Sequence, residues 1–345
     1  MDVTAAPVIS FDRVTKQYAD GTLAVHELSL DVAQGELLCL VGPSGCGKTT
    51  TMKMVNRLVE PSSGRVLVQG NDVAGVDPAE LRRGIGYVIQ QVGLFPHQSV
   101  GDNIATVPRL LGWDKRRSSA RADELLELVG LEPATYRDRY PSQLSGGQRQ
   151  RVGVARALAA DPPVLLMDEP FSAIDPIARG RLQQEFLRVQ RTVRKTIVFV
   201  THDLDEAVLL ADRVAVLAQG GVLAQHDSPA DVLGAPATPF VEEFVGAERG
   251  LRRLGVTGLD LTALQDREHA TGHWLSGRPV VTVDAAATLK DVLAAVLSSD
   301  EGWVLVTDGS RELGAVGAQG VQEMLRASIA GEGAVRGSLP PGPRP

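Results

Sequence analysis

The chain has 345 residues, enough for about two domains, and its 43% hydrophobic and 22% charged residues are typical of a globular protein with a sizeable core. The net charge of −7 disfavours nucleic acid as the main partner, because duplex-binding proteins usually carry a basic excess. No stretch approaches the ~18 consecutive apolar residues of a membrane-spanning helix, and the start lacks the pattern of a signal peptide. The two cysteines, Cys39 and Cys46, lie in one segment and predict no disulfide framework. These features together predict a cytosolic protein.

The first part of the chain predicts strands, then a loop and a helix. Residues 8–41 alternate short apolar runs with turns. Residues 37–41 are continuously apolar, as expected of a strand that is covered on both faces. The glycine-rich segment 42–50 follows, and residues 51–58 predict a helix.

Strands and helices keep alternating further along the chain. Residues 64–90 return to strand patterns, whereas residues 114–130 have helical spacing with apolar side chains on one side and charges on the other. Residues 164–170 and 196–203 predict two buried strands, with a helix over residues 181–193 between them. This succession predicts an α/β domain with a largely parallel sheet.

The segment between the strand 37–41 and the next helix has the pattern of a phosphate loop, Gly42-x4-Gly47-Lys48-Thr49. The glycines allow backbone N–H groups to converge on phosphates, and the helix that follows adds its dipole. Lys48 supplies a cation for the outer phosphates, and the Thr49 hydroxyl can ligate Mg²⁺. The predicted nucleotide-binding residues of this loop are Gly42, Pro43, Ser44, Gly45, Cys46, Gly47, Lys48, Thr49 and Thr50.

Two carboxylates end the buried strand that begins at Val164. In open α/β sheets, ligands bind at the carboxyl ends of the strands. Asp168 is predicted to hold Mg²⁺, and Glu169 is predicted to orient or deprotonate an attacking water molecule.

Residues 144–148 read Leu-Ser-Gly-Gly-Gln and stand just before a helical stretch. They offer hydroxyl and N–H donors to an anion but include no carboxylate, histidine or metal ligand, so they cannot catalyse a reaction alone. This segment resembles the signature motif of ATP-binding cassette (ABC) proteins. Further motifs of that family match in order over about residues 8–245.

The resemblance implies a P-loop NTPase fold with a helical subdomain at residues 99–140, and it assigns roles to single residues. Tyr18 is similar to the aromatic residue that stacks on adenine, and Gln90 to the glutamine that serves the metal and the water. Asp175 ends a segment that resembles the D-loop, with Ile174 in place of leucine. His202 resembles the switch histidine that contacts the γ-phosphate. The implied catalytic residues are Glu169, His202 and Gln90, and the implied metal ligands are Thr49, Gln90 and Asp168.

The resemblance also implies a head-to-tail dimer of two copies. ATP on the phosphate loop of one copy would be capped by the signature motif of the other, through Ser145, Gly146, Gly147 and Gln148. Closure of the dimer would then depend on ATP, and hydrolysis would open it.

Three functions fit such a cassette: an import ATPase, a non-transport cassette that acts on ribosomes or DNA, and a binding module without turnover. Only one phosphate loop is present, and about 95 residues without coiled-coil heptads separate Lys48 from the signature motif. No membrane helices are fused to the cassette, and Glu169 predicts turnover. The resemblance therefore implies the ATPase subunit of a bacterial importer at the cytoplasmic face of the membrane. Its partners would be permease subunits and, indirectly, an extracytoplasmic solute-binding protein.

Residues 86–100 and 239–246 resemble the importer group for quaternary amines, which takes up glycine betaine, carnitine, choline or proline as osmoprotectants. Importers of methionine or polyamines stay as alternatives, because the solute pocket would lie in other chains.

The cassette pattern covers residues 8–246, and a different organisation follows. Residues 247–278 predict a linker with a possible helix. Residues 279–328 predict the order strand–helix–strand–strand–helix with a hairpin, which resembles one cystathionine-β-synthase-type (CBS) repeat. Such repeats normally pair, so this single copy would either pair with the repeat of the second subunit or be degenerate. The resemblance implies a sensor of ionic strength or of an adenine nucleotide, and the alternative is a small α/β appendage that only stabilises the dimer. Residues 329–345 are rich in glycine and proline and predict a disordered tail.

Overall fold

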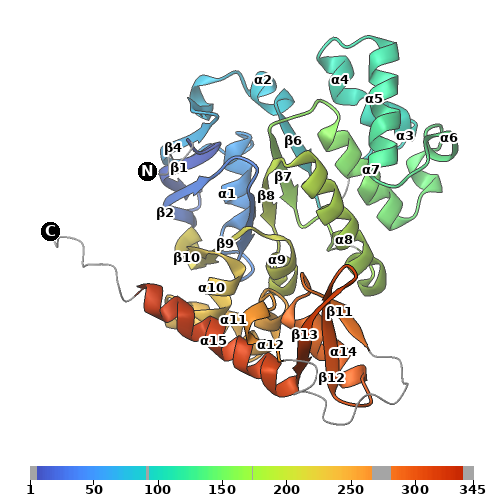
Figure 1. Cartoon of the computed structure of the whole chain (residues 1–345). Helices are drawn as coiled ribbons and strands as arrows, with labels where there is room; N and C mark the ends of the chain where they lie inside the picture. Colours follow the sequence, from blue (N-terminus) through green and yellow to red (C-terminus); the bar gives the residue numbers. More distant parts are fainter. Residues whose placement is uncertain (1–5, 91–92, 173, 266–280, 337–345) are drawn as a thin grey trace. The chain divides into compact units, whose positions relative to one another are not determined.

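The computed structural model describes residues 6–90, 93–172, 174–265 and 281–336 (Figure 1). The chain forms two compact units, Met1–His226 and Asp227–Pro345. Over the described ranges, no helix is both long and apolar enough to cross a membrane.

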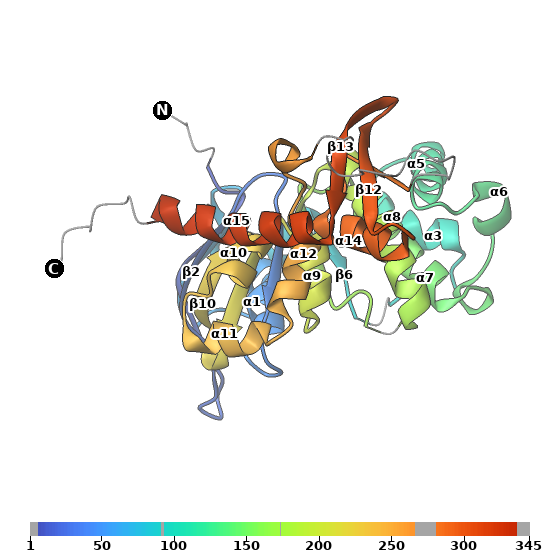
Figure 2. The same ribbon diagram turned by 60° about the horizontal axis from the view of Figure 1, so that its bottom comes forward.

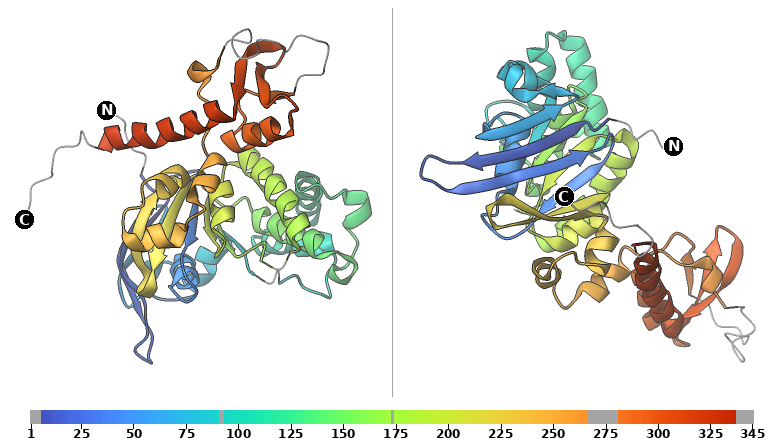
Figure 3. Two further views of the ribbon diagram at one scale, coloured as in Figure 1. Left: turned by 90° about the horizontal axis from the view of Figure 1, so that it is seen from below. Right: turned by 90° about the vertical axis from the view of Figure 1, so that its left-hand side faces the viewer.

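The first unit contains two sheets. One is antiparallel, has the strand order β2-β1-β4-β5 and forms the blue ribbons of Figure 3. Its strands are β1 (Ile9–Gln17), β2 (Leu23–Val32), β4 (Ser63–Val68) and β5 (Asn71–Asp72). The other has the order β10-β9-β3-β8-β7-β6, and the neighbours from β9 to β6 run parallel. Its strands are β3 (Leu37–Val41), β6 (Ile85–Val88), β7 (Val164–Asp168), β8 (Thr196–Val200), β9 (Arg213–Ala218) and β10 (Val222–Asp227). The predicted α/β class with a largely parallel sheet is confirmed, whereas the separate antiparallel sheet was not predicted.

Helix α1 (Lys48–Val55) packs against both sheets. Its Met52 and Val55 join Val14 of β1, Leu40 of β3 and Val200 of β8 in one buried cluster. Each such side chain stabilises the fold by roughly 1.5–3 kcal/mol when it is fully removed from water. The loop that precedes α1 is therefore held by the best-packed part of the unit.

A group of helices lies to one side of the parallel sheet, drawn in teal and light green in Figure 3. They are α3 (Val100–Ile104), α4 (Thr106–Leu110), α5 (Lys115–Leu128), α6 (Pro133–Tyr136) and α7 (Gly146–Leu158). The carboxylate of Asp114 accepts the Arg117 N–H at 2.8 Å and caps α5, which buries Leu125 and Leu126 as its periodicity predicts. Helices α3 to α6 lie within the predicted helical subdomain of residues 99–140, and α7 extends the group beyond that limit. The remaining helices of the unit are α2 (Pro78–Arg83), α8 (Pro176–Val193) and α9 (Leu204–Leu210).

The second unit is built on a sheet of order β11-β12-β13, in which β11 and β12 are parallel and β12 and β13 antiparallel. Helices α14 and α15 and strands β12 and β13 are drawn in orange and red in Figure 2. Side chains of the two helices share one apolar cluster with the strands, for example Leu289, Met324 and Val306. The predicted element order and the hairpin near residue 309 are confirmed. The elements are α10 (Pro229–Gly234), α11 (Pro239–Val245), α12 (Arg249–Leu254), β11 (Thr282–Asp284), α14 (Leu289–Ser298), β12 (Trp303–Asp308), β13 (Arg311–Gly317) and α15 (Ala318–Arg336).

The packing of the second unit differs from the predicted limits at 246 and 328. Arg253 of α12, in the predicted linker, donates to the carbonyl oxygens of Ala230 in α10 (3.1 Å) and Ser328 in α15 (3.2 Å). Helices α10 to α12 therefore pack with the C-terminal elements. Helix α15 continues to Arg336, into the predicted disordered tail, because good helix formers fill most of it and the prolines begin only at 340. The predicted linker residues 266–278 lie outside the described part.

Candidate functional site

The phosphate loop between β3 and α1 requires glycine at two of its positions. Gly42 and Gly47 have φ angles of 146° and 106°, which L side chains rarely adopt. A Cβ atom on Gly42 would lie 2.2 Å from the carbonyl oxygen of Leu217, and one on Gly47 would lie 2.1 Å from that of Ala24. The fold closes around this loop so tightly that no side chain fits at either position.

Lys48 places a buried cation in this loop. Its side chain is 7% exposed, and Nζ donates to the carbonyl oxygens of Gly42 (2.8 Å) and Pro43 (2.9 Å). Among the described residues, no carboxylate lies within ion-pair distance of Nζ. The N-terminus of α1 has no side-chain acceptor for its N–H groups. A buried ammonium beside an uncapped helix N-terminus fits a polyanion such as a nucleotide phosphate.

Thr49 and Asp168 meet at the edge of the sheet. The Thr49 hydroxyl donates to Oδ1 of Asp168 at 3.0 Å. Burial raises the pKa of Asp168, although the hydrogen bond from Thr49 opposes the shift. Burial and the nearby Asp168 charge raise the pKa of Tyr87 to about 12. The two oxygens suit a hard cation such as Mg²⁺, which usually takes its other ligands from water and phosphate. No group of three His, Cys, Asp or Glu side chains that could hold a metal occurs over the described ranges.

Gln90, Glu169 and His202 converge because their strands are neighbours. Strand β7 lies between β6 and β8, so the residues that follow these three strands meet at one edge of the sheet. Gln90 Nε2 donates to Oε2 of Glu169 at 3.2 Å, and His202 Nδ1 lies 3.2 Å from the same oxygen. Glu169 has a left-handed backbone with φ of 43°, a conformation of the kind that strains a non-glycine residue and clusters at functional sites.

Tyr18 lies beside the same loop. It follows β1, and its hydroxyl is 3.3 Å from the Thr50 hydroxyl. The side chain is 40% exposed, and Lys16 Nζ lies 5.1 Å from the ring centroid. An exposed ring next to a phosphate loop is available to stack on a nucleotide base.

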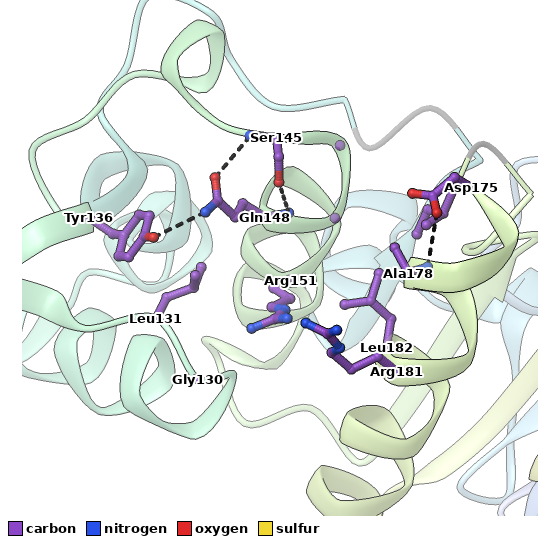
Figure 4. Close-up of a pocket in the computed structure, with 13 residues that line it drawn as sticks. Gly130, Leu131, Tyr136, Ser145, Gln148, Arg151, Asp175, Ala178, Arg181 and Leu182 are labelled. Atoms are coloured by element: carbon purple, nitrogen blue, oxygen red, sulfur yellow. Dashed lines mark hydrogen bonds between the residues drawn. The ribbon is translucent and has the colours of Figure 1, made fainter.

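The signature residues lie at the N-terminus of α7, away from the phosphate loop. Ser145 Oγ accepts the Gln148 N–H at 3.2 Å, and the Gln148 side chain accepts the Ser145 N–H at 2.9 Å (Figure 4). The Gln148 amide also donates to the Tyr136 hydroxyl at 3.0 Å. Gln148 therefore closes a capping box, and its predicted contact with nucleotide stays a prediction. This box was not predicted, although the spacing Ser145-x-x-Gln148 indicates it.

A cavity of about 630 Å³ opens at the signature motif (Figure 4). Its walls include Ser145, Gly146, Gly147 and the predicted D-loop residue Asp175, but no residue of the phosphate loop. Arg151 and Arg181 also line it, and neither was singled out in the sequence. The structure therefore brings Gln90, Asp168, Glu169 and His202 together at the phosphate loop and keeps the signature motif apart.

A parallel sheet with a phosphate loop before α1 and two carboxylates at the end of β7, Asp168 and Glu169, defines a P-loop NTPase. Residues 25–172 match the family model described as ABC transporter. The chain is 48% identical over 327 residues to the glycine betaine/carnitine/choline transport ATP-binding protein of Bacillus subtilis, covering 94% of this chain and 82% of that protein. It is 49% identical over 273 residues to the glycine betaine uptake system ATP-binding protein of Escherichia coli, covering 78% and 86%.

The chain belongs to the family of ABC transporter ATP-binding subunits, and it is an ATP-binding and ATP-hydrolysing protein of that family. A similar solved structure is a dimeric ATP-binding cassette in a post-hydrolysis state bound to ADP and Pi. It has 31% sequence identity and a TM-score of 0.57, and the match covers 64% of this chain and 98% of that chain. Both the fold and the predicted class of enzyme are thus confirmed.

Proposed function

We propose that this chain powers an importer for quaternary-amine osmoprotectants such as glycine betaine, carnitine, choline or proline. The observation that carries the proposal is the 48% identity to a glycine betaine/carnitine/choline transport subunit, which extends over 94% of this chain and so beyond the cassette. The chain would be peripheral at the cytoplasmic face of the membrane.

ATP would bind with its base on Tyr18 and its phosphates over residues 42–50. The Lys48 ammonium group is already held by a carbonyl oxygen of the loop, that of Gly42, and it would turn toward the outer phosphates. Thr49, Asp168 and Gln90 would hold Mg²⁺, which supplies positive charge to the phosphate oxygens. These side chains fix the γ-phosphate at the edge of the sheet where Glu169 lies.

Glu169 would orient the attacking water and accept its proton. The water oxygen bonds to the γ-phosphorus while the bond from that phosphorus to the β,γ-bridging oxygen breaks, which yields ADP and phosphate. Gln90 and His202 both hold Oε2 of Glu169 at 3.2 Å. His202 would also contact the γ-phosphate and so report its presence.

The second copy of the chain would complete the site. Ser145, Gly146 and Gly147 would offer donors to the γ-phosphate on the partner's loop, with Gln148 and Asp175 beside them. The large cavity at these residues contains none of the chain's own phosphate loop, so its occupant would come from the other copy.

The permease would dock at the helical subdomain. A second cavity of about 350 Å³ lies between β6 and the helices, lined by Tyr87, Gly93, Phe95, Val107 and Arg156 among others. A mixed lining of rings, small residues and guanidinium groups suits a segment of another protein. The solute-binding protein would act only through that permease.

We further propose that residues 279–328 form a CBS-like module that regulates transport with ionic strength. Its sheet and two helices share one apolar cluster, which Leu254 of α12 also joins. A test deletes residues 259–345 and keeps α10 to α12, because Arg253 ties α12 to α10. Loss of the salt dependence of uptake is expected, and unchanged salt dependence would refute the regulatory role.

Uptake of labelled glycine betaine at high salt tests the transport proposal. The cells are those of the organism from which the chain comes, and they carry either the wild-type chain or Glu169→Gln as its only copy. The amide keeps the shape of the carboxylate but cannot accept the proton, so uptake should fall by at least about 100-fold. Unchanged uptake with stable protein and no second importer would remove the substrate claim and point to another solute. Purified Glu169→Gln should bind ATP, dimerise and fail to hydrolyse it.

A further inference from the structure

Arg179 stands in the first turn of α8, and its side chain bridges two segments that flank the proposed catalytic residues. Nη2 donates to the carbonyl oxygen of Ile174 at 3.2 Å, in the D-loop segment that follows Glu169. Nη1 lies 3.7 Å from Oδ2 of Asp203, the residue after His202. One planar guanidinium group thus donates a hydrogen bond to one segment and lies within ion-pair distance of the other, which favours one relative position of the two.

Asp203 is a rigid partner because its other oxygen is already used. Oδ1 accepts the N–H groups of Asp205 (2.9 Å) and Glu206 (3.2 Å) and so caps α9. The Asp203 N–H donates to the Thr201 hydroxyl at 3.0 Å. One carboxylate oxygen therefore fixes the start of α9, and the other faces Arg179.

The contacts around Arg179 close a ring through the catalytic residues. The Ser172 hydroxyl donates to the Glu169 carbonyl oxygen at 2.9 Å, which ties the D-loop segment to Glu169. Arg179 then joins that segment to Asp203, and the neighbouring His202 returns to Glu169 at 3.2 Å. A cavity of about 10 Å³ inside this ring is lined by Glu169, Arg179, His202 and Asp203 among others. The small volume shows that Glu169, Arg179 and Asp203 pack closely around this space, whereas the His202 side chain is 63% exposed and depends on its contact with Glu169 for its position.

We propose that Arg179 is a positioning residue that holds the D-loop segment and the His202 segment in one arrangement and so keeps His202 in contact with Glu169. The inference rests on the proposed roles of Glu169 and His202. Arg179 touches no reacting atom and acts through the two segments it joins. Its loss should slow the chemical step and leave ATP binding, which depends on the phosphate loop, almost unchanged.

The test compares variants of the purified full-length chain by the kcat and KM of ATP hydrolysis. Arg179→Met keeps the length of the side chain and removes the charge, and kcat should fall about tenfold or more with KM nearly unchanged, because small misplacements of catalytic groups cost that much. Arg179→Lys should recover part of kcat, since it keeps the charge. Arg191→Met removes an exposed arginine from the same helix and should match wild type.

The Asp203→Asn variant distinguishes a loss of positioning of His202 from a loss of stability of the fold. Asparagine caps a helix as well as aspartate does, so α9 keeps its N-cap while the ion pair is lost. We expect Asp203→Asn to lower kcat, and the double variant with Arg179→Met to be little slower than either single one, because both changes break the same link. Thermal unfolding of each variant checks that the fold is kept.

Three outcomes would overturn the inference: a kcat for Arg179→Met within twofold of wild type, losses in the double variant that multiply, or an equal loss in Arg191→Met. If Arg179→Met does not fold, an unchanged kcat in Asp203→Asn decides against the inference. Glu169→Gln is measured in parallel. Hydrolysis by that variant would contradict the proposed role of Glu169, whereas its loss together with a normal Arg179→Met would refute only the role of Arg179.

Discussion

The N-termini of α1 and α7 are built in opposite ways, although both are proposed to face phosphate. Helix α1 begins after Gly47, which has a left-handed backbone and offers no side-chain acceptor. Helix α7 begins after Ser145, whose hydroxyl forms a capping box with Gln148. The first N–H groups of α1 thus depend on a ligand or water, whereas α7 has a cap of its own before any nucleotide arrives.

The charges around the two helix ends differ as well. Lys48, Asp168 and Glu169 gather at α1, where Lys48 is buried and burial raises the pKa of Asp168. At α7, Arg151 pairs with Glu185 at 2.9 Å, and no member of the signature motif can transfer a proton. Under the proposed function, the α1 end would bind and hydrolyse ATP, and the α7 end would recognise a nucleotide held by a second copy.

The difference between the two helix ends predicts that the largest effect, a loss of ATP affinity, follows substitution of Lys48. Lys48→Met fills the same space without the charge, so the affinity of the chain for ATP should fall on the order of 100-fold, about 2.7 kcal/mol. Thermal stability without nucleotide should hardly change, because the buried ammonium is itself costly. Nucleotide titration and thermal unfolding measure both, with Lys115→Met on the exposed face of α5 as the control. An unchanged affinity would refute the assignment of the loop.

At α7 we expect the reverse of Lys48→Met: a substitution should change thermal stability and leave the ATP affinity of the single chain unchanged. Ser145→Ala removes the acceptor for the Gln148 N–H, which should cost about 1 kcal/mol and lower the unfolding midpoint by roughly 2–4 °C. The ATP affinity of the single chain should stay the same while hydrolysis falls. Ser145→Asp should restore the cap and the midpoint but not hydrolysis, because its charge repels phosphate. If a single Ser145→Ala chain bound ATP more weakly than the wild-type chain, the proposed difference between the two helix ends would be refuted.

Much of the phosphate-loop site was predictable because its signals are local. Glycine spacing identifies the loop at residues 42–50, and a buried strand that ends in carboxylates identifies residues 164–169. Gln90 and His202 are different, since by residue type alone neither indicates catalysis. They meet Glu169 only because β6, β7 and β8 are neighbours in the sheet, and strand order is a long-range property that residue patterns do not contain.

The misses have the same origin. The separate sheet of β1, β2, β4 and β5 shares its strand pattern with the parallel sheet, so only long-range pairing distinguishes them. The link from Arg179 to Asp203 joins residues 24 positions apart through one charge pair, which no spacing rule indicates. Helix α15 extends beyond the predicted module to Arg336, because its helix-forming residues outweigh the glycines at 331 and 333.

The smallest expected effect is the pH-dependent contribution of Asp168 to the free energy of unfolding, and the direction of its pKa shift decides the sign of that contribution. Burial raises its pKa above the ordinary value of 3.8, so the folded chain binds this proton more tightly than the unfolded chain does. The charged carboxylate therefore lowers the free energy of unfolding, and this penalty grows as the pH rises through the raised pKa and is complete above it.

Asp168→Asn removes this penalty, and its amide oxygen can still accept the Thr49 hydroxyl. Without nucleotide, the unfolding midpoint of the variant should exceed that of wild type by about 1–3 °C at neutral pH. The difference should vanish as the pH falls below the ordinary carboxyl range, where both forms are neutral. Asp114→Asn keeps the cap of α5 and should leave the midpoint unchanged. A lower midpoint for Asp168→Asn at neutral pH would mean that attraction to Lys53 and Lys48 outweighs burial, and that the phosphate-loop edge is stable without its ligand after all.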